Sequence, residues 1–178
     1  MANAMYTKGR QAFLEGSIAW LTDNIKINLL SAASYTPVLA TDQFLNVIPG
    51  GAIIATSANL ASKTSTGGTA NAANVTFSAV SGGQASYVGI YKDTGTSSTS
   101  PLIALLDTAT NLPVTPNGGD ITVQWDTGAN KIFTLFESLS EKDASLGARL
   151  RDWLRGLGIP ARLSPGGIWI PAPVIVQG

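Results

Sequence analysis

Short apolar runs separated by turn-forming residues recur along the first three quarters of the chain. Four of them follow one another closely, at residues 87–91, 102–106, 121–125 and 132–135. They are rich in β-branched and aromatic residues, which fit the half-buried surface of a sheet. In the third run Ile121, Val123 and Trp125 alternate with polar residues, so we expect that strand to have one dry face and one wet face. The pattern predicts an antiparallel meander of four strands within residues 84–135.

Further strands are expected before this meander, at residues 25–30, 52–55, 60–64 and 75–80. In the first of these, apolar residues alternate with Lys26 and Asn28. The stretch 64–74 contains only small and polar residues and is expected to be a loop. Residues 41–45 are expected to form one helical turn with Thr41 as its N-cap. Together these elements predict an all-β domain, either an antiparallel β-sandwich or a jelly-roll-like fold.

The N-terminal segment carries a weaker pattern. Phe13, Leu14, Ile18 and Leu21 recur near helical spacing and indicate a short helix within residues 1–22. Two interpretations remain open for this segment. Either the segment lies against the sheet of its own domain, or it is an arm that binds a neighbouring subunit.

The pattern changes to that of a helix after the last predicted strand. Ser140 is a candidate N-cap, and Asp143 takes the reciprocal position of a capping box. Apolar residues then recur on one stripe, at Leu146, Leu150, Trp153, Leu154 and Leu157. This spacing predicts an amphipathic helix that ends before Gly158 and Pro160.

An apolar extended tail, residues 168–176, follows a hinge rich in Gly and Pro at residues 156–167. Pro171 and Pro173 cannot donate to a ladder, which bars this tail from a central strand. It suits an edge strand or a strap laid on another chain.

Two domains are therefore expected, a β-sandwich domain over residues 1–135 and an attachment device over residues 136–178. The second combines the predicted helix and tail, whose apolar side chains need a surface to cover them. The predicted partner-binding residues are Trp153, Leu154, Leu157, Trp169, Ile170, Val174 and Ile175.

The composition limits which catalytic and metal-binding groups the protein can offer. The 178 residues include no Cys and no His, which removes thiolate nucleophiles, disulfides, and the commonest general base and metal ligand. The 11 basic and 11 acidic side chains cancel, which argues against a nucleic-acid-binding protein. No apolar run has the length of a membrane helix.

Residues 64–91 carry no charge at all. We expect such a surface to be covered by a partner subunit, and among homo-oligomers we favour a trimer.

The triplet Asp-Thr-Gly occurs twice, at residues 93–95 and 126–128. Aspartic proteases use this triplet to bring two carboxylates together. The same triplet is also ordinary turn chemistry, in which Asp caps the turn and Gly takes a positive φ. The two copies lie too close in sequence to supply two lobes of one protease, although two copies of Asp126 can meet in a dimer. We favour the turn interpretation, and no catalytic residue is predicted.

Two groups of residues are candidate binding sites, and each also has a simpler structural role. Asp107, Asp120 and Asp126 are candidate calcium ligands at one end of the sheet, or carboxylates that cap turns. The aromatic residues Tyr87, Tyr91, Trp125 and Phe133 form either a sugar-stacking platform or part of the hydrophobic core. We favour the simpler role in both cases, and no metal or cofactor is predicted.

Several stretches resemble a group of small virion proteins of tailed phages. They read ANAMY at residues 2–6, YKDTG at 91–95, LPVTPNGGDI at 112–121 and NKIF at 130–133. The resemblance extends to about residue 135, where proteins of this group usually end. It implies a capsid decoration protein or another head-associated structural protein, and it supplies no catalytic residues.

The sequence therefore leads to a structural function rather than an enzymatic one. We expect a phage virion protein, a capsid decoration or cement protein that binds the major capsid protein lattice and stabilises the head. It would be made in the host cytoplasm and reside on the capsid surface. Its expected partners are the major capsid protein and further copies of itself, without nucleic acid or membrane. The alternative is a head- or tail-fibre module that contacts a host receptor or glycan.

Overall fold

The chain divides into two compact units, Met1–Leu135 and Phe136–Gly178. The computed structural model describes residues 3–109, 111–128, 131–135, 162–164 and 167–169. In the second unit, Arg162–Ser164 (β11) and Gly167–Trp169 (β12) form an antiparallel hairpin. A strand therefore occupies part of the stretch that the sequence predicted to be a hinge.

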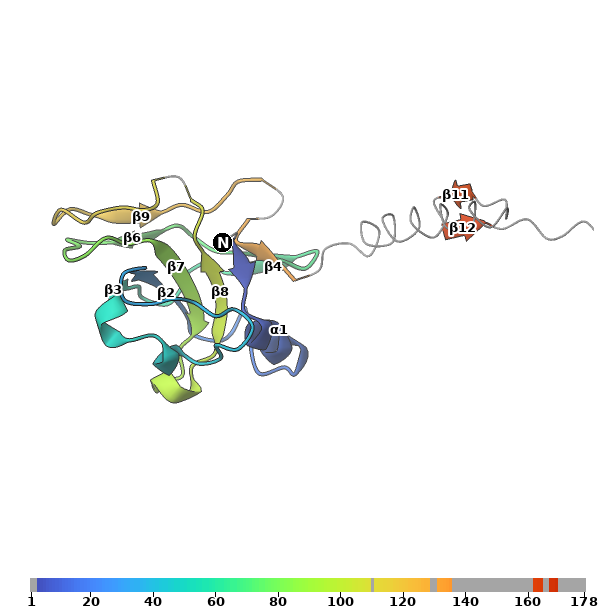
Figure 1. The fold of residues 1–178 in the computed structure, drawn as a ribbon. Coiled ribbons are helices and arrows are strands. Elements are labelled where there is room, and N and C mark those ends of the chain that lie inside the picture. Colours follow the sequence, from blue (N-terminus) through green and yellow to red (C-terminus); the bar gives the residue numbers. More distant parts are fainter. Residues whose placement is uncertain (1–2, 110, 129–130, 136–161, 165–166, 170–178) are drawn as a thin grey trace, which may run out of the picture. The chain divides into compact units, whose positions relative to one another are not determined.

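The larger sheet of the first unit has five antiparallel strands in the order β1-β8-β7-β2-β3 (Figure 1). They are β1 (Ala4–Met5), β2 (Ile25–Leu30), β3 (Ile53–Thr56), β7 (Tyr87–Lys92) and β8 (Leu102–Leu106). In the central pair, β2 and β7, Ile27 lies opposite Ile90. The strands predicted at residues 25–30 and 102–106 are confirmed with the same bounds.

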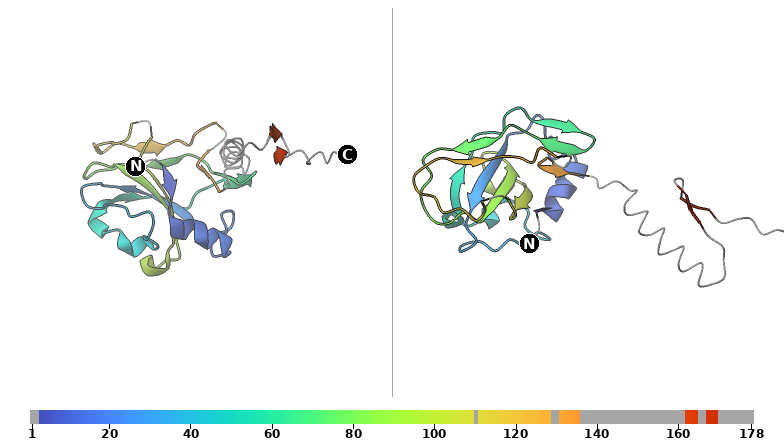
Figure 2. Two further views of the ribbon diagram at one scale, coloured as in Figure 1. Left: turned by 45° about the vertical axis from the view of Figure 1, so that its right-hand side comes forward. Right: turned by 90° about the horizontal axis from the view of Figure 1, so that it is seen from above.

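Two smaller sheets form a second layer over one face of the larger sheet (Figures 1 and 2). One has the order β10-β5-β4, and the other pairs β6 with β9. Their strands are β4 (Thr64–Thr66), β5 (Thr69–Asn71), β6 (Val75–Phe77), β9 (Ile121–Val123) and β10 (Phe133–Thr134). The described part of the chain is therefore mostly antiparallel β-structure with a sandwich-like arrangement, as the sequence predicts.

The predicted four-strand meander is correct only for its first two strands. β7 and β8 are neighbours, but β9 pairs with β6 and β10 pairs with β5. The edge of β8 that faces away from β7 is paired with β1, where Ala4 lies opposite Leu105. Because no edge remains beside β8, the chain crosses to the second layer after it.

The stretch 64–74, predicted to be a loop, contains the hairpin of β4 and β5. Gly67 and Gly68 form its turn with φ of 58° and 80°, a conformation that glycine adopts without strain. Thr is a good strand former, and Ala70 is buried against the core. Residues 60–63, where the sequence predicted a strand, are irregular instead.

The N-terminal segment packs on the larger sheet. Its helix α1 (Thr7–Leu14) follows β1, and the Tyr6 N–H donates to the Ile103 carbonyl at 3.0 Å. These contacts support the interpretation that the segment lies against its own domain. The predicted apolar stripe is wrong at Leu14 and Leu21, which are 82% and 55% exposed.

The described part of the first unit also contains three 3-10 turns, η1 (Leu45–Val47), η2 (Gly50–Ala52) and η3 (Ser97–Thr99). The helical turn predicted at residues 41–45 thus begins later, and Phe44 rather than Thr41 precedes it. Asp42 bonds within the turn before η1, where its Oδ2 accepts from the Val38 N–H at 2.9 Å.

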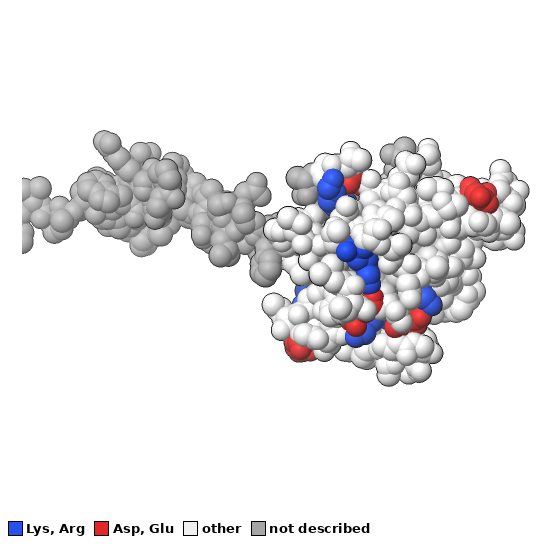
Figure 3. Space-filling model, turned by 180° about the vertical axis from the view of Figure 1, so that it is seen from behind, with Lys and Arg blue, Asp and Glu red and all other residues white. Residues whose placement is uncertain are grey.

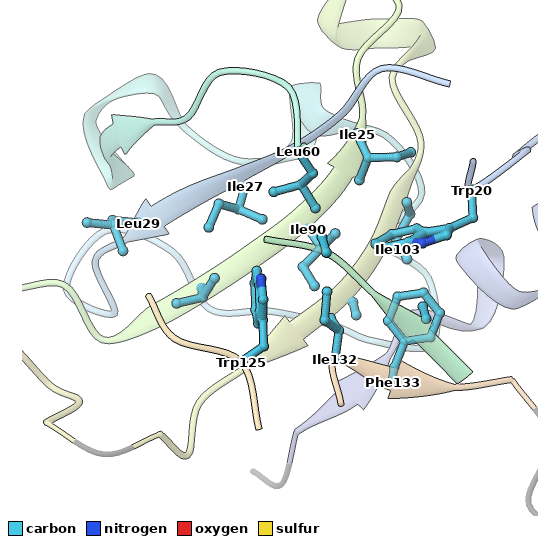
Figure 4. Packing of buried hydrophobic residues seen from close by; sticks show 14 of the residues in the cluster. Trp20, Ile25, Ile27, Leu29, Leu60, Ile90, Ile103, Trp125, Ile132 and Phe133 are labelled. Carbon is cyan, nitrogen blue, oxygen red and sulfur yellow. The ribbon is translucent and has the colours of Figure 1, made fainter. Parts of the chain in front are cut away.

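The main hydrophobic core fills the space between the two layers (Figure 4). The larger sheet contributes side chains such as Ile27 and Ile103, each 0% exposed. Trp125 and Phe133 approach from the second layer, and the ring of Trp20 meets that of Phe133 edge-on at 5.2 Å. Each large apolar side chain buried in this way stabilises the fold by about 1.5–3 kcal/mol.

A second apolar cluster covers the opposite face of the larger sheet. It includes Tyr6, Tyr35 and Ile48, and it buries the face of β2 that carries Asn28. Asn28 is 1% exposed, and its Oδ1 has no hydrogen-bond partner among the described residues. Both faces of β2 are therefore buried, although its alternating pattern is typical of a half-buried strand.

A buried chain of hydrogen bonds ties the N-terminal segment to the loop after β2. The Tyr6 and Tyr35 hydroxyls lie 3.1 Å apart, and the Tyr35 hydroxyl donates to Asp42 Oδ2 at 2.6 Å. Burial raises the pKa of Tyr6 to about 12. Burial also raises the pKa of Tyr35, and its hydrogen bond to Asp42 adds to this effect. Both phenols are therefore held in their neutral form.

Candidate functional site, a cleft along the edge of β9

A cleft with a volume of about 970 Å³ lies beside β9 and the residues that follow it. All eight consecutive residues from 120 to 127 line this cleft. Three of them, residues 121–123, form β9, and successive residues of a strand point to opposite faces, so a cavity lined by all three follows the edge of β9. The cleft therefore presents backbone as well as side chains.

The cleft is lined by apolar side chains from the larger sheet. Leu29 of β2 and Val88 of β7 line it but are only 1% and 2% exposed, whereas Leu106 of β8 is partly exposed. Leu112 and Val114, from the stretch between β8 and β9, contribute further apolar groups that are partly exposed. Apolar surface in an open cleft is well suited to bind apolar side chains of a ligand.

Within the described residues, no strand lies at the edge of β9 that faces away from β6. Among these residues its partner is β6, with Thr76 opposite Thr122. Among the described residues, no further backbone hydrogen bond is formed by residues 121–124. A free strand edge offers unpaired N–H and C=O groups to another strand.

The polar side chains of the cleft hold its own turns. Asp126 Oδ1 accepts from the Gly128 N–H at 3.0 Å, and Asp120 Oδ1 accepts from the Ala79 N–H at 3.0 Å. The Lys131 ammonium donates to the Thr127 carbonyl at 2.7 Å. This arrangement provides recognition through apolar contacts and backbone hydrogen bonds.

Both Asp-Thr-Gly triplets form turns capped by their Asp, but the positive φ predicted for Gly is found in the first triplet and not at Gly128. Asp93 Oδ1 accepts from the Gly95 N–H at 2.9 Å, and Gly95 has a φ of 82°. Asp126 and Gly128 repeat this bond in the second copy. Each carboxylate is thus committed to the turn in which it lies.

Asp93 also belongs to an ion-pair network at one end of β2 and β7. Lys26 Nζ lies 2.6 Å from Asp93 Oδ2, and Lys92 Nζ lies 2.9 Å from Asp23 Oδ2. The Lys63 ammonium donates to the Asp23 carbonyl. The Lys26 ammonium, followed by the Gly95 N–H, lowers the pKa of the Asp93 carboxyl. For Asp23, burial raises the pKa, but the Ala19 N–H and Lys92 outweigh it and the net pKa is lowered.

The network gathers much of the charge of the first unit in one place. On the face seen in Figure 3, most of the surface is neither basic nor acidic. The stretch without charged residues, 64–91, forms β4, β5, β6 and most of β7. On the second layer the exposed hydroxyls of Thr76 and Thr122 bond to one another at 2.9 Å. The part of this layer built from β4, β5 and β6 therefore presents a neutral surface rich in hydroxyl groups.

The candidate metal and sugar sites are not formed in the described part of the chain. No group of three or more acidic side chains there is able to hold a metal ion, so Asp107, Asp120 and Asp126 do not form the calcium site considered above. The aromatic residues considered for a sugar platform belong to the two apolar clusters, namely Tyr87, Tyr91, Trp125 and Phe133.

The predicted partner-binding residues fall almost entirely outside the described residues. This holds for Trp153, Leu154, Leu157, Ile170, Val174 and Ile175. Trp169 lies in β12, where its backbone pairs with Arg162. The predicted helix within residues 140–158 also lies outside the described part of the chain. These assignments remain predictions.

The cleft was not predicted from the sequence. Its signal was partly present, because residues 121–125 were expected to alternate in polarity. The pairing of β9 with β6, which leaves the other edge of β9 free, depends on strands 46 positions apart at Thr76 and Thr122. Local patterns do not specify such a pairing.

No protein-family model matches this chain, and no curated protein matches it. Within the described residues, no helix has the length and apolar character needed to cross a membrane.

Proposed function

We propose that this protein is a structural component of a tailed-phage particle, a decoration protein that binds the major capsid protein lattice. The resemblance of residues 2–6 and 91–133 to small virion proteins supports this class of function. It fits a chain without Cys or His, in which both Asp-Thr-Gly triplets form turns.

The neutral second layer is the observation that carries the proposal. A charged surface loses hydration when a partner covers it, and this loss opposes binding unless each charge is paired. Thr and Ser hydroxyls have a smaller desolvation cost and adapt as donor or acceptor. The layer built from β4, β5 and β6 is therefore suited to burial against a protein lattice.

We also propose that residues 136–178 attach the protein to its neighbours through an amphipathic helix within residues 140–158 and an apolar tail. In this proposal the β domain, sandwich-like or jelly-roll-like, occupies the lattice site. The second unit then contacts adjacent subunits through Trp153, Trp169 and the other apolar residues named above. Each attachment adds avidity without any chemical step.

The test uses purified phage particles from which the tails have been removed. The protein is expected to remain on the heads, and its loss with the tails would contradict the proposal and support the fibre alternative. A second test adds purified protein to heads that lack it. Thr66→Lys, which puts a charge on the exposed hairpin of the second layer, is expected to reduce binding at least about tenfold. Ser34→Lys, an exposed control on the loop after β2, is expected to bind normally.

A further inference from the structure

We propose that Asn117 is a site of spontaneous deamidation, and that the fold controls this reaction through the turn in which Asn117 lies. Asn117 and Gly118 precede β9, and both residues are exposed. Among the Asn residues of the chain, only Asn117 is followed by Gly. The residue after Asn supplies the attacking nitrogen, and Gly has no side chain to shield it. The inference concerns the chemistry of this turn and is independent of the proposed function.

The reaction replaces the side-chain amide of Asn117 by a carboxylate. The Gly118 nitrogen loses its proton to hydroxide or water, forms a bond to Asn117 Cγ and expels the side-chain nitrogen, which takes up a proton and leaves as ammonia. Water then opens the cyclic imide that remains. Attack of water at Cγ yields Asp, whereas attack at the main-chain carbonyl carbon of residue 117 yields isoaspartate. Each event consumes one water, releases one ammonia and involves no oxidation or reduction.

The native turn blocks the first step of this reaction. The Gly118 N–H donates to the Val80 carbonyl oxygen at 2.8 Å, so its proton is directed at a group that is too weak a base to remove it. The Val80 N–H donates in return to the Gly119 carbonyl at 2.9 Å, and Val80 is 4% exposed in the main core. Loss of the Gly118 proton therefore requires the turn to open, as does the exchange of any protected amide hydrogen.

The carbon that is attacked, in contrast, is already activated in the native turn. The Gly119 N–H donates to Asn117 Oδ1 at 3.0 Å, which draws electron density away from Cγ. A donor in this position also stabilises the negative charge that develops on the oxygen during attack. The rate therefore depends on one equilibrium, the opening of the bond between Gly118 and Val80.

Two features beside this bond determine how often it opens. Asp120 Oδ1 accepts from the Ala79 N–H at 3.0 Å and holds the two segments together next to Val80. Ala79 has a φ of 52°, a left-handed conformation that is strained for alanine and not for glycine. The hydrogen bond keeps the turn closed, whereas the strain opposes closure.

Each deamidation leaves a permanent change in the domain. It lowers the formal net charge of the chain, which is zero before the reaction, by one. In the isoaspartate product the chain runs through the side-chain carbons, which adds one carbon to the backbone beside Gly118. The bonds of Gly118 and Gly119 to Val80 can then no longer both form in the native register. The product accumulates with the time that the turn spends open, and it weakens the turn in which it forms.

Incubation of the full-length protein in mildly alkaline buffer, with and without denaturant, tests the block. Mass spectrometry of the peptide that contains Asn117 measures deamidation, and labelling by an isoaspartyl methyltransferase measures isoaspartate. The native protein is expected to react at least about tenfold more slowly than the unfolded chain. Asn117→Ser, which caps turns without an amide, is the control and is expected to form no such product at this position. Equal rates, or a faster reaction in the native protein, would overturn the proposal.

Two substitutions beside the turn are expected to change the native rate in opposite directions. Asp120→Ala loses the bond to Ala79 and is expected to react at least about threefold faster, whereas Asp120→Asn removes the charge but keeps an acceptor oxygen. Ala79→Gly relieves the strain and is expected to react at least about threefold more slowly. Dividing each native rate by the rate of the same variant in denaturant removes the direct effect of the charge on the chemistry. An Asp120→Ala ratio equal to that of Asp120→Asn, or an Ala79→Gly ratio equal to that of the parent, would overturn the proposal.

Hydrogen exchange of the Gly118 amide, followed by nuclear magnetic resonance, provides an independent measurement of the same opening. Because both reactions begin with loss of the Gly118 proton, the variants at residues 79 and 120 are expected to change exchange and deamidation by the same factor. Exchange of Gly118 in the native protein as fast as in an unprotected amide would show that the turn does not protect this nitrogen, and the proposal would fail.

Discussion

Gly9 of α1 lies so close to β8 that a Cβ atom at this position would be 2.5 Å from the Leu102 carbonyl oxygen. The Ile103 carbonyl oxygen would be at 2.9 Å. Both neighbours are backbone atoms of a strand that is paired on its two edges, so neither can move aside without breaking the sheet. Only glycine allows the helix to approach the sheet this closely.

Gly9→Ala is therefore expected to destabilise the first unit by about 1–3 kcal/mol, the usual cost of overpacking. Alanine is otherwise the better helix former, so a gain in stability would contradict the close approach. Gly50→Ala is the matched control, because a Cβ there meets nothing within 4 Å. Chemical denaturation of the two variants, compared with the parent protein, measures the difference.

The two Asp-Thr-Gly turns are expected to respond differently to the same substitution. Asn caps a turn as Asp does, so Asp126→Asn is expected to change the free energy of unfolding by less than about 0.5 kcal/mol and to leave function intact. Asp93→Asn also breaks the partly exposed ion pair with Lys26 and is expected to cost about 0.5–1 kcal/mol. Loss of particle binding by folded Asp126→Asn would instead identify a functional carboxylate.

Acid is expected to destabilise the protein through Asp93 and Asp23. The folded pKa of each is lowered, so each contributes stability that is fully present above the unfolded pKa of about 3.9. This contribution is lost as the pH falls through the folded value. Denaturant midpoints measured from pH 7 downwards are expected to decline below about pH 4, less steeply in Asp93→Asn. An equally steep decline in that variant would assign the acid sensitivity to other groups.

Alkaline conditions are expected to act through the buried tyrosines. The pKa of Tyr6 is raised to about 12, so its contribution to stability is fully present below the unfolded value of about 10 and is lost as the pH rises through 12. Tyr6→Phe is expected to cost about 1 kcal/mol at pH 7, through the lost bond to Tyr35, and to show a smaller further loss between pH 10 and 12. Unfolding curves at neutral and alkaline pH test this. An unchanged alkaline loss would place it at other residues, such as Tyr91, whose pKa burial also raises to about 12.

A chain that ends at residue 136 is expected to retain a folded, cooperatively melting β domain. Among the described residues, every member of the two apolar clusters lies at or before position 135, and the first compact unit ends there. Circular dichroism during heating reports the melting, and binding to heads is expected to be weaker. Failure of this shorter chain to fold would show that residues 137–178 belong to the core, and unchanged binding would show that they are not an attachment device.

The sequence was a good guide to strands and a poor guide to their partners. The run from Ile25 to Leu30 has strand periodicity and becomes β2 with the same bounds, because side-chain alternation is a local property. The neighbour of β9 is not local. The sequence predicted that β9 pairs with β8, on the assumption that successive strands pair. The edge of β8 is taken by β1, and β9 pairs with β6 instead.

The sequence predicted the turns at Asp93 and Asp126 but missed the turn at Gly67, and the difference has a physical reason. Asp93 and Asp126 cap their own turns, and that bond spans two residues, so the triplet alone indicates it. The hairpin at Gly67 was missed, because short strands of Thr, Ser and Ala carry little hydrophobic signal. The cleft depends on the meeting of segments such as Leu29 and Gln124, which no short pattern reports.

The pairing of β1 with β8 also has a consequence for the order of folding. Residues 4 and 5 are made before the other strands of this sheet, yet their partners are Leu105 and Ala104, which are made about a hundred residues later. Such a distant contact closes late, because the loop between its ends must be ordered first. During synthesis, the N-terminal segment with α1 therefore waits without its sheet until β8 emerges. A nascent chain arrested before residue 106 is left with the apolar surface of β2 and β7 uncovered, and this is the stage at which a chaperone has most to protect.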